Sequence, residues 1–506
     1  MTGHPRIRSI LIANRGEIAV RVMRTCREMG ISTVAVYSDA DRGMAHVQAA
    51  DRAYRIGPPP SRESYLNMSA IIDVARGAGV DAIHPGYGFL AENPEFASRV
   101  REAGMVFIGP SPDAIRAMGD KTEARRLVRA AGVPTVPGSD GPIEREEEAR
   151  AFCEAHGFPV LLKAAAGGGG KGMRVVDRME DLSGSLRSAR SEAQSAFGDR
   201  RIYLEKYLEN PRHVEFQILG DTHGGIVHLG ERECSVQRRH QKIVEESPSV
   251  LLDDDLRGRM GETAVRAAAS CGYTNAGTIE FLVDRGRNFY FLEMNTRLQV
   301  EHPVTEMRTG LDLVALQIRI AEGARLPFTQ SEIAFRGHAI ECRICAEDVQ
   351  QDYLPSTGRI VHLRPSSGPG IREDRGIEQG SEIPVYYDSL ISKLVAWAPT
   401  REEAMSKMER ALAEYELVGV STNISLCRAV LQNAAFRKGL YDTHLLTHGM
   451  NTGSLARPDR SMLVATAALC ALLEHQASAS APQGQPGRQP VNASGWRGQR
   501  TSRMRD

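Results

Sequence analysis

The chain has 506 residues, which is too long for a single hydrophobic core and predicts roughly three domains. Its 63 basic and 63 acidic side chains balance, so no overall charge indicates a nucleic-acid or membrane partner. The apolar runs ILIA, near the start, and MLVATAALCALL, near residue 470, are too short for the core of a signal peptide or for a bilayer span of about 20 residues. We therefore expect a cytoplasmic protein.

The first elements follow a strand, helix and strand pattern. RSILIAN, a helical EIAVRVMRTCREMG and STVAVYS have the spacing of a βαβ unit, which predicts a parallel sheet. A helical connection follows and is stopped by Gly132 and Pro134. We expect a mixed α/β and α+β fold with these parts: an N-terminal α/β domain, 1–110; a helical linker, 111–134; a small domain with a glycine lid, 135–207; a larger α+β region, 208–450; a helical extension, 451–475; and a disordered Gly/Pro/Ser-rich tail, 476–506.

The stretch KAAAGGGGKGM, residues 163–173, is a glycine-rich loop between two predicted strands, FPVLLKAA and MRVV. Without side chains, successive N–H groups can approach an anion such as phosphate. The stretch fails the Walker pattern because Ala165 replaces its first glycine and Gly172 follows Lys171. A dinucleotide fingerprint needs a helix after the loop, and the kinase tripeptides H-R-D and D-F-G are absent. We interpret the loop as a lid over phosphates whose other contacts come from elsewhere.

Lysine is rare and unevenly placed in this chain. There are eight lysines against 55 arginines, and five of the eight fall between residues 121 and 242. A compact ammonium on a flexible stem suits point contacts to phosphate oxygens and is not interchangeable with a planar guanidinium. The clustering therefore favours a phosphate site over chance placement of solvated lysines. The five are Lys121, Lys163, Lys171, Lys206 and Lys242.

Two strand-like runs, TIEFLV and NFYFLEMN, flank a turn at residues 284–287. If Gly286 and Arg287 form a two-residue hairpin loop, Glu280 and Glu293 are directly opposite and project on the same face. Asn295 points to that face as well and adds a neutral oxygen. Carboxylate and carbonyl oxygens select hard cations, so the hairpin predicts a Mg²⁺ or Mn²⁺ site beside a nucleotide's phosphates. The alternative is a solvated sheet edge with two ordinary glutamates.

The next segment, NTRLQVEHPVTE, places Arg297, Gln299 and Glu301 at alternating positions, like one face of an extended strand. An arginine and a glutamate close to a metal nucleotide could bind a small planar anion and move its proton. A structural salt bridge is the simpler interpretation of this segment alone.

Nine motifs together resemble one family, the biotin carboxylases of the ATP-grasp superfamily. The resemblance covers residues 6 to about 450, and its motifs are specific and occur in the family's order. They are IANRGEIAVR, HPGYGFLAENPEF, FIGPSPDAI with MGDK, EKYLENPRHVE, QRRHQKIVEE, EMNTRLQVEHPVTE, GHAIECRICAED and YYDSLISKL. The family often has an unbroken glycine run and an arginine where this chain has Ala166 and Lys171, which leaves the dynamics of the lid open.

The resemblance implies an ATP-grasp fold and a role for each matching residue. For ATP these residues are Lys121, Lys163, Gly169, Gly170, Glu205, Lys206, Leu208, His213, Gln237, His240, Glu280 and Glu293. For the metal they are Glu280, Glu293 and Asn295, in agreement with the hairpin interpretation. For bicarbonate and biotin they are Lys242, Arg297, Gln299, Val300, Tyr87 and Arg343, with Glu301 as general base and Arg343 stabilising the biotin enolate; Arg297, Glu301, Lys242 and Arg343 form the catalytic set.

The implied reaction is carboxylation of biotin through carboxyphosphate, with ATP, Mg²⁺ or Mn²⁺ and bicarbonate. The resemblance is to the subunit of acetyl-CoA carboxylase that serves fatty acid biosynthesis, and the alternative is the corresponding subunit of a pyruvate or propionyl-CoA carboxylase. The expected partners are a biotin carboxyl carrier protein, carboxyltransferase subunits and a second copy of the chain. Two other functions stay open: a non-catalytic nucleotide or bicarbonate sensor, and an ATP-grasp ligase joining a carboxylate to an amine.

Overall fold

The computed structural model describes residues 6–139, 141–165, 172–239 and 241–450, together with the short helical pairs 468–469, 471–472 and 475–476. Gly169, Gly170, Ala166, Lys171 and His240 lie outside the described residues, as do nearly all positions of the expected helical extension and tail. None of the helices in the described part of the chain is long and apolar enough to cross a membrane.

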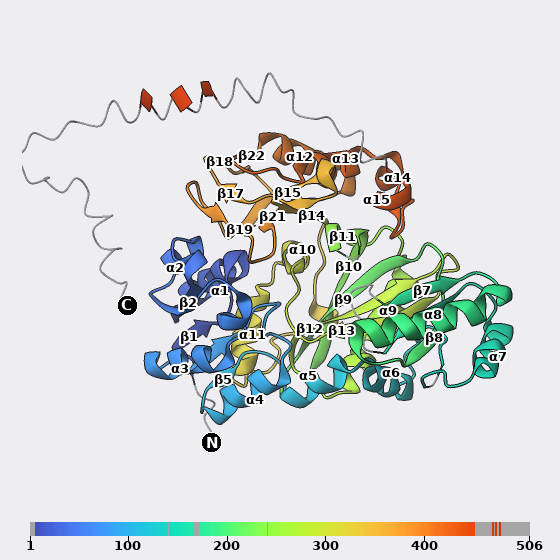
Figure 1. Cartoon of the computed structure of the whole chain (residues 1–506). Helices are drawn as coiled ribbons and strands as arrows, with labels where there is room; N and C mark the ends of the chain where they lie inside the picture. Colours follow the sequence, from blue (N-terminus) through green and yellow to red (C-terminus); the bar gives the residue numbers. More distant parts are fainter. Residues whose placement is uncertain are drawn as a thin grey trace, which may run out of the picture.

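The N-terminal part is a parallel five-stranded sheet in the order β3–β2–β1–β4–β5 (Figure 1). Ile10 and Ile12 pack into the cluster on one face and Leu11 into the cluster on the other, which explains why the strand is apolar at every position. The predicted parallel α/β architecture is confirmed. The strands are β1 Ser9–Ile12, β2 Ser32–Ser38, β3 Arg52–Gly57, β4 Ala82–His84 and β5 Val106–Phe107, and the helices are α1 Gly16–Glu28, α2 Ala45–Ala49, α3 Met68–Ala78 and α4 Pro94–Glu102.

The predicted helical connection is two helices rather than one, α5 Pro112–Gly119 and α6 Lys121–Ala130. Asp120 ends the first and caps the second, because its carboxylate accepts hydrogen bonds from the backbone N–H groups of Thr122 and Glu123, both at 2.9 Å. Lys121 is thereby the first residue of α6.

The lid domain is a three-stranded antiparallel sheet in the order β7–β6–β8, formed by β6 Val160–Ala164, β7 Met173–Val176 and β8 Ile202–Lys206. Helices α7 Glu146–His156 and α8 Met179–Phe197 accompany it, and the small core includes Val160, Leu162 and Leu204. Both strands predicted to flank the glycine loop are present, and they pair antiparallel from Val160–Val176 to Lys163–Met173.

The rest of the chain is organised by one long antiparallel sheet in the order β13–β12–β9–β10–β11–β14–β21–β19. In Figure 1 it lies between the N-terminal domain (blue) and the lid domain (green), with α12 and α13 above its far end. Helix α9 covers β9, β12 and β13, whereas α12 and α13 cover β11, β14 and β21. The strands are β9 Arg212–Gly220, β10 Ile226–Arg238, β11 Gln241–Ser247, β12 Asn275–Val283, β13 Phe289–Asn295, β14 His338–Cys345, β19 Ile371–Arg375 and β21 Leu390–Ala398.

The remaining elements connect and cover this sheet. The helices are α9 Asp254–Ala269, α10 His302–Thr309, α11 Leu313–Ala321, α12 Arg401–Glu414, α13 Ile424–Gln432, α14 Ala434–Arg437 and α15 Leu445–His448. The short strands pair as β15 Glu347–Asp348 with β16 Leu354–Pro355, β17 Gly358–Arg359 with β20 Glu382–Ile383, and β18 His362–Arg364 with β22 Glu416–Val418.

Candidate active site

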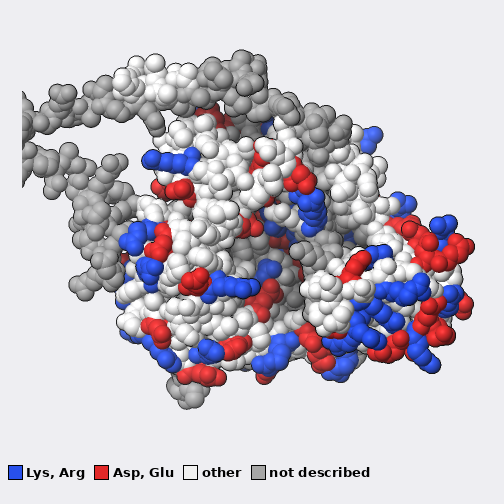
Figure 2. Space-filling view, in the orientation of Figure 1, with Lys and Arg blue, Asp and Glu red and all other residues white. Residues whose placement is uncertain are grey.

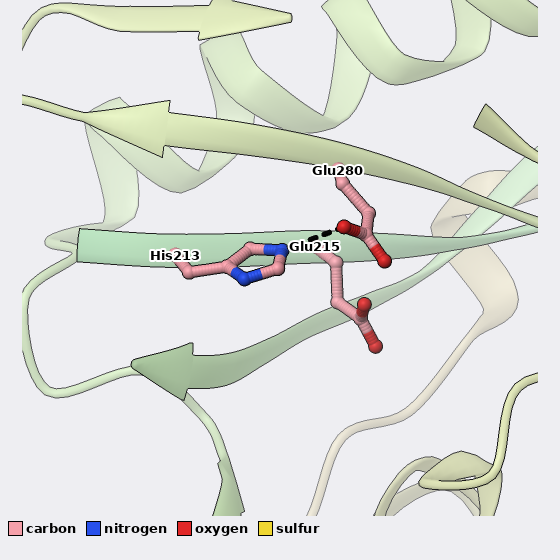
Figure 3. Close-up of side chains that lie close together, drawn as sticks. All are labelled: His213, Glu215 and Glu280. Atoms are coloured by element: carbon pink, nitrogen blue, oxygen red, sulfur yellow. Dashed lines mark ion pairs between the residues drawn. The ribbon is translucent and has the colours of Figure 1, made fainter. Parts of the chain in front are cut away.

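A group of charged side chains lies on one face of the long sheet. Charged residues on a sheet face are usually exposed to solvent, but these are buried. His213 and Glu215 alternate along β9 and are both buried. Glu280 reaches the same region from the neighbouring strand β12, and Figure 3 shows the three side chains converging. His213 Nε2 lies 2.8 Å from Glu280 Oε2. Burial alone would lower the pKa of His213, but the charge and hydrogen bond of Glu280, together with the charge of Glu215, raise that pKa.

The hairpin of β12 and β13 pairs Glu280 directly with Glu293, as predicted. The predicted two-residue loop is wrong. The turn has three residues, 285–287, closed by a 2.9 Å hydrogen bond from the Asp284 N–H to the Asn288 carbonyl, and only Arg287 has a left-handed φ, of +62°. The register changes between Glu280 and the next pair, leaving Leu292 as an extra residue on β13, and this bulge restores the predicted pairing.

Lys242 of β11 is the cation at the centre of the group. Its Nζ lies 2.6 Å from Glu215, 2.6 Å from Glu301 and 3.1 Å from Glu280. Burial acts to lower the pKa of Lys242, but the acidic groups around it raise the pKa well above its usual value. Lys242 and His213 likewise outweigh burial at Glu280 and hold the pKa of that carboxyl below its usual value.

Glu301 is the base predicted from the resemblance, and it is fully buried between two cations. Besides Lys242, Arg343 of β14 contacts it, with Nη2 2.9 Å from Glu301 Oε2. Burial opposes ionisation, yet Lys242 and Arg343 lower the pKa of Glu301 well below its usual value. Glu301 is therefore a carboxylate at neutral pH and able to accept a proton. It is not part of an extended face as predicted, because it occupies the N-cap position of α10.

Arg297 is held by hydrogen bonds to each side of its guanidinium. It donates to Glu92 at 2.7 Å, to Gln299 at 2.8 Å and to Asn295 at 2.9 Å. Asn295 and Gln299 in turn donate to Glu280, at 2.9 and 3.1 Å. The segment predicted to bind an anion is thus joined directly to the carboxylates predicted to bind a metal.

A second group of predicted residues lies toward the lid domain. Lys163 of β6 and Arg125 of α6 both pair with the buried carboxylate of Glu205. Burial, together with Arg125 and Lys121, lowers the pKa of Lys163, although Glu205 acts in the opposite direction. Lys121 is also within electrostatic range of Glu293. Lys121, at the start of α6, is therefore within electrostatic range both of Lys163 in the lid domain and of Glu293 in the β12–β13 hairpin.

Four further predicted residues lie outside this centre, and a fifth, Gln237, lies on the strand beside Lys242. The Lys206 ammonium donates to the Phe158 carbonyl at 2.8 Å, and Leu208 follows β8 in a half-buried loop. The hydroxyl of Tyr87 donates to Glu17 of α1, and the carbonyl of Val300 accepts from Lys393 of β21 at 2.8 Å. Gln237 is buried on β10 directly opposite Lys242.

Several residues of the site were not identified from the sequence. Arg232 is completely buried and bonds Glu215 at 2.5 Å, Gln217 at 2.7 Å and Thr278 at 3.0 Å. The charged triplet ERE, residues 231–233, could have indicated it, because an arginine inside a buried strand needs acidic or polar partners. Glu245, which accepts from Arg343 at 2.6 Å, carried a similar signal.

The residues present fit a hard divalent cation at the hairpin. Glu280 and Glu293 face each other on adjacent strands, Glu293 is open to solvent, and Asn295 adds an amide oxygen, which are the oxygen donors that Mg²⁺ prefers. Two other groups, His213–Glu215–Glu280 and Glu215–Cys234–Glu301, have ligand atoms within 4.8 Å of one another. Glu215 belongs to both of these groups, and its charge is already compensated by Lys242 and Arg232, whereas no ion pair of Glu293 is found among the described residues.

Figure 2 shows this face of the molecule hollowed between the N-terminal and lid domains, with acidic and basic side chains in the hollow. Of the site residues, Glu293 is exposed and Arg297 half-buried, whereas Glu301 is fully buried.

The sequence matches three family domains in succession: the biotin carboxylase N-terminal domain over residues 6–115, the ATP-binding domain of the carbamoyl-phosphate synthase L chain over 120–329, and the biotin carboxylase C-terminal domain over 341–448. It is 53% identical over 434 residues to biotin carboxylase from Nostoc sp., covering 86% of this chain and 97% of that protein. It is 52% identical over 437 residues to a pyruvate carboxylase subunit from Methanothermobacter thermautotrophicus, covering 86% of this chain and 89% of that protein.

A solved structure agrees with these relatives. It is the biotin carboxylase domain dimer of Hydrogenobacter thermophilus 2-oxoglutarate carboxylase in complex with MgADP, ADP and bicarbonate. It has 49% sequence identity and a TM-score of 0.84, and the match covers 90% of this chain and all of that one. The chain therefore belongs to the biotin carboxylase family, whose members are ATP-dependent carboxylases with the ATP-grasp fold.

Proposed function

We propose that this chain carboxylates biotin with ATP and bicarbonate. The observation that carries the proposal is Glu301, an ionised buried carboxylate between Lys242 and Arg343. In the same segment, Arg297 is bonded to Glu280 of the hairpin through Asn295. A positioned base, an anion-binding arginine and a metal-nucleotide site are the three parts that this reaction needs.

Each step can be written with the chain's own residues. Arg297 and Lys242 orient bicarbonate. Glu301 accepts the bicarbonate proton while a bicarbonate oxygen attacks the γ-phosphorus of ATP and ADP leaves. The product, carboxyphosphate, breaks down to CO₂ and phosphate, the phosphate removes the proton from the ureido nitrogen, and that nitrogen attacks CO₂ while Arg343 stabilises the enolate oxygen. Lys121 and Lys163 balance charge on the transferring phosphoryl group. A divalent ion held by Glu280, Glu293 and Asn295 would supply further positive charge there when bound.

The test is ATP hydrolysis by the purified chain with bicarbonate, with and without free biotin. Hydrolysis that free biotin stimulates is the expected result. No hydrolysis would favour the sensor, and hydrolysis that depends on an amine instead of biotin would favour another ATP-grasp ligase.

Replacing Glu293 by glutamine should weaken the binding of Mg·ATP, because one anionic oxygen donor of the hairpin disappears. Loss of even an outer partner of a metal site typically costs about 10- to 100-fold in affinity, so we expect at least about a tenfold loss by calorimetry. Glu382→Gln, which neutralises an exposed glutamate on β20, is the matched control and should bind normally. Unchanged Mg·ATP affinity in the Glu293→Gln variant would remove Glu293 from the metal site.

For the final carboxyl acceptor we propose acetyl-CoA, in fatty acid biosynthesis through malonyl-CoA. This rests on the resemblance to the biotin carboxylase of acetyl-CoA carboxylase. The alternative is a pyruvate or propionyl-CoA carboxylase, which the similarity to the Methanothermobacter pyruvate carboxylase protein supports equally well. Partners of the proposed assembly are a second copy of the chain, a biotin carrier and carboxyltransferase subunits. The seven described cysteines are free thiols, as is typical of the reducing cytoplasm that we propose for it.

The biotin is expected to arrive on a carrier domain outside these 506 residues. Biotinyl domains of the family present their acceptor lysine in a Met-Lys pair, and this sequence contains no Met-Lys. The purified chain, made in cells with active biotin ligase, should therefore give a blank avidin blot. An avidin-positive band on this polypeptide would show that it carries biotin itself.

A further inference from the structure

Lys393 of β21 is a completely buried lysine that is not among the predicted site residues. Its ammonium donates to the Val300 carbonyl at 2.8 Å and lies 3.2 Å from Glu17 Oε2 and 4.0 Å from Asp374 Oδ2. The three partners come from three places in the chain: the loop before α10, the first turn of α1, and β19. One ammonium therefore joins the N-terminal domain to the far end of the long sheet and to the loop that carries the base.

Two partners of Lys393, Val300 and Glu17, are connected to residues that are proposed to act on bicarbonate and biotin. Val300 directly precedes Glu301, so the hydrogen bond from Lys393 fixes the peptide next to the base. The other carboxylate oxygen of Glu17 accepts from the hydroxyl of Tyr87. On the sheet, Lys393 is the direct cross-strand partner of Arg343, so its side chain emerges on the same face as that guanidinium.

Stability alone does not explain a lysine in this place. Two buried charges lose their hydration, and a well-packed apolar pair of similar volume is often as stable or more stable. The nearby Glu341 does not account for it either. Neither of its carboxyl oxygens has a hydrogen-bond partner among the described residues, and burial raises its pKa well above the usual value, which disfavours the charged form that an ion pair with Lys393 would need.

We propose that Lys393, paired with Glu17, is a positioning residue that holds the Val300–Glu301 peptide and Tyr87 in register across the interface between the N-terminal domain and the long sheet. The inference rests on the proposed function, since it assigns Lys393 to the biotin-dependent step of that reaction. The described residues predicted to bind Mg·ATP lie on α6, β6, the segment from β8 to β10, and the β12–β13 hairpin. None of them is among the hydrogen-bond or ion-pair partners of Lys393, so nucleotide binding should be independent of it.

The test compares Lys393→Met with Lys407→Met in the intact chain. Lys407 is the matched control, because its ammonium also donates to a carbonyl of β21, that of Trp397 at 3.2 Å, but from α12 on the opposite face of the sheet. We expect at least about a tenfold fall in kcat/KM for free biotin in Lys393→Met, because a misplacement of about 1 Å can cost about 100-fold. The Mg·ATP affinity of Lys393→Met should stay within about twofold of wild type. For Lys407→Met, both the Mg·ATP affinity and kcat/KM for biotin should stay within about twofold, because a displaced catalytic group would cause a larger change.

Glu17→Gln is the second variant, and it addresses the possibility that Lys393→Met does not fold. The amide keeps an oxygen to accept from Tyr87 and removes the carboxylate that faces Lys393. Burial raises the pKa of Glu17 to about 7, so the kinetics are compared at about pH 8, where the wild-type group is charged. It should lower kcat/KM for biotin in the same direction, again with normal Mg·ATP binding. Wild-type biotin kinetics in either folded variant, or equal losses in biotin turnover and Mg·ATP binding, would overturn the positioning role. Failure of the proposed function is distinguishable, since the wild-type chain itself would then show no biotin-stimulated hydrolysis.

Discussion

Glu301→Gln is expected to abolish biotin-dependent ATP turnover while leaving Mg·ATP binding near normal. The amide keeps the shape of the side chain but cannot accept the bicarbonate proton, and a positioned base contributes roughly 10²- to 10⁴-fold. The fold should survive, because Arg343 keeps Glu245 and Lys242 keeps Glu215 and Glu280 as partners. Steady-state ATP hydrolysis with bicarbonate and biotin, together with calorimetry of Mg·ATP, measures both parts of the prediction.

Glu341→Gln is the matched control for that experiment. Glu341 is as deeply buried as Glu301 and lies within electrostatic range of it, and burial raises its pKa well above the usual value, which favours the uncharged form. An amide at this position should therefore leave turnover close to wild type. If Glu301→Gln kept more than about a tenth of wild-type turnover, the loss would be too small for a general base and the assignment would be wrong.

The β12–β13 hairpin shows what a local pattern can predict. Two strand-like runs, a turn and the two-residue period of a strand were enough to pair Glu280 with Glu293. The turn itself was predicted incorrectly, because a two-residue loop of the favoured type requires left-handed φ at both positions, and only Arg287 adopts it. The longer turn shifts the strand register by one residue, and the bulge at Leu292 shifts it back, so Glu280 still pairs with Glu293.

The contacts that complete the site could not be predicted in this way. Glu92 lies 205 positions from Arg297, and Glu17 meets Lys393 from the opposite end of the chain. Nothing in the spacing of these residues indicates the partner, since the contacts depend on how the N-terminal domain packs against the long sheet. Periodicity identifies which side chains share a face, whereas tertiary packing decides which faces meet.

The balance of charge explains why Lys242 is central to the site. Glu215, Glu280 and Glu301 converge on it, and Arg232 and Arg343 each neutralise only part of the group from one side. Three carboxylates this close would otherwise repel one another and take up protons. Lys242 therefore keeps Glu301 ionised, which a general base requires, while presenting positive charge to an incoming anion.

Lys242→Met is accordingly expected to abolish turnover and to destabilise the fold. Removing one partner of a buried ionic group typically costs about 3–5 kcal/mol, because the remaining charges are left without compensation. The loss should depend on pH. In the wild type the lowered pKa of Glu301 contributes stability that is present above the carboxyl's unfolded pKa and disappears as the pH falls. In the variant the uncompensated carboxylates have raised pKa values, so stability is lost as the pH rises.

The difference in unfolding free energy between wild type and Lys242→Met should thus shrink as the pH is lowered from about 7 to about 5. Urea unfolding followed by circular dichroism at the two pH values measures it. Lys407→Met serves as the control again, because its lysine has no carboxylate partner among the described ion pairs and its effect should not vary with pH. If Lys242→Met destabilises the fold equally at both pH values, the loss comes from packing and not from the charge of the ammonium.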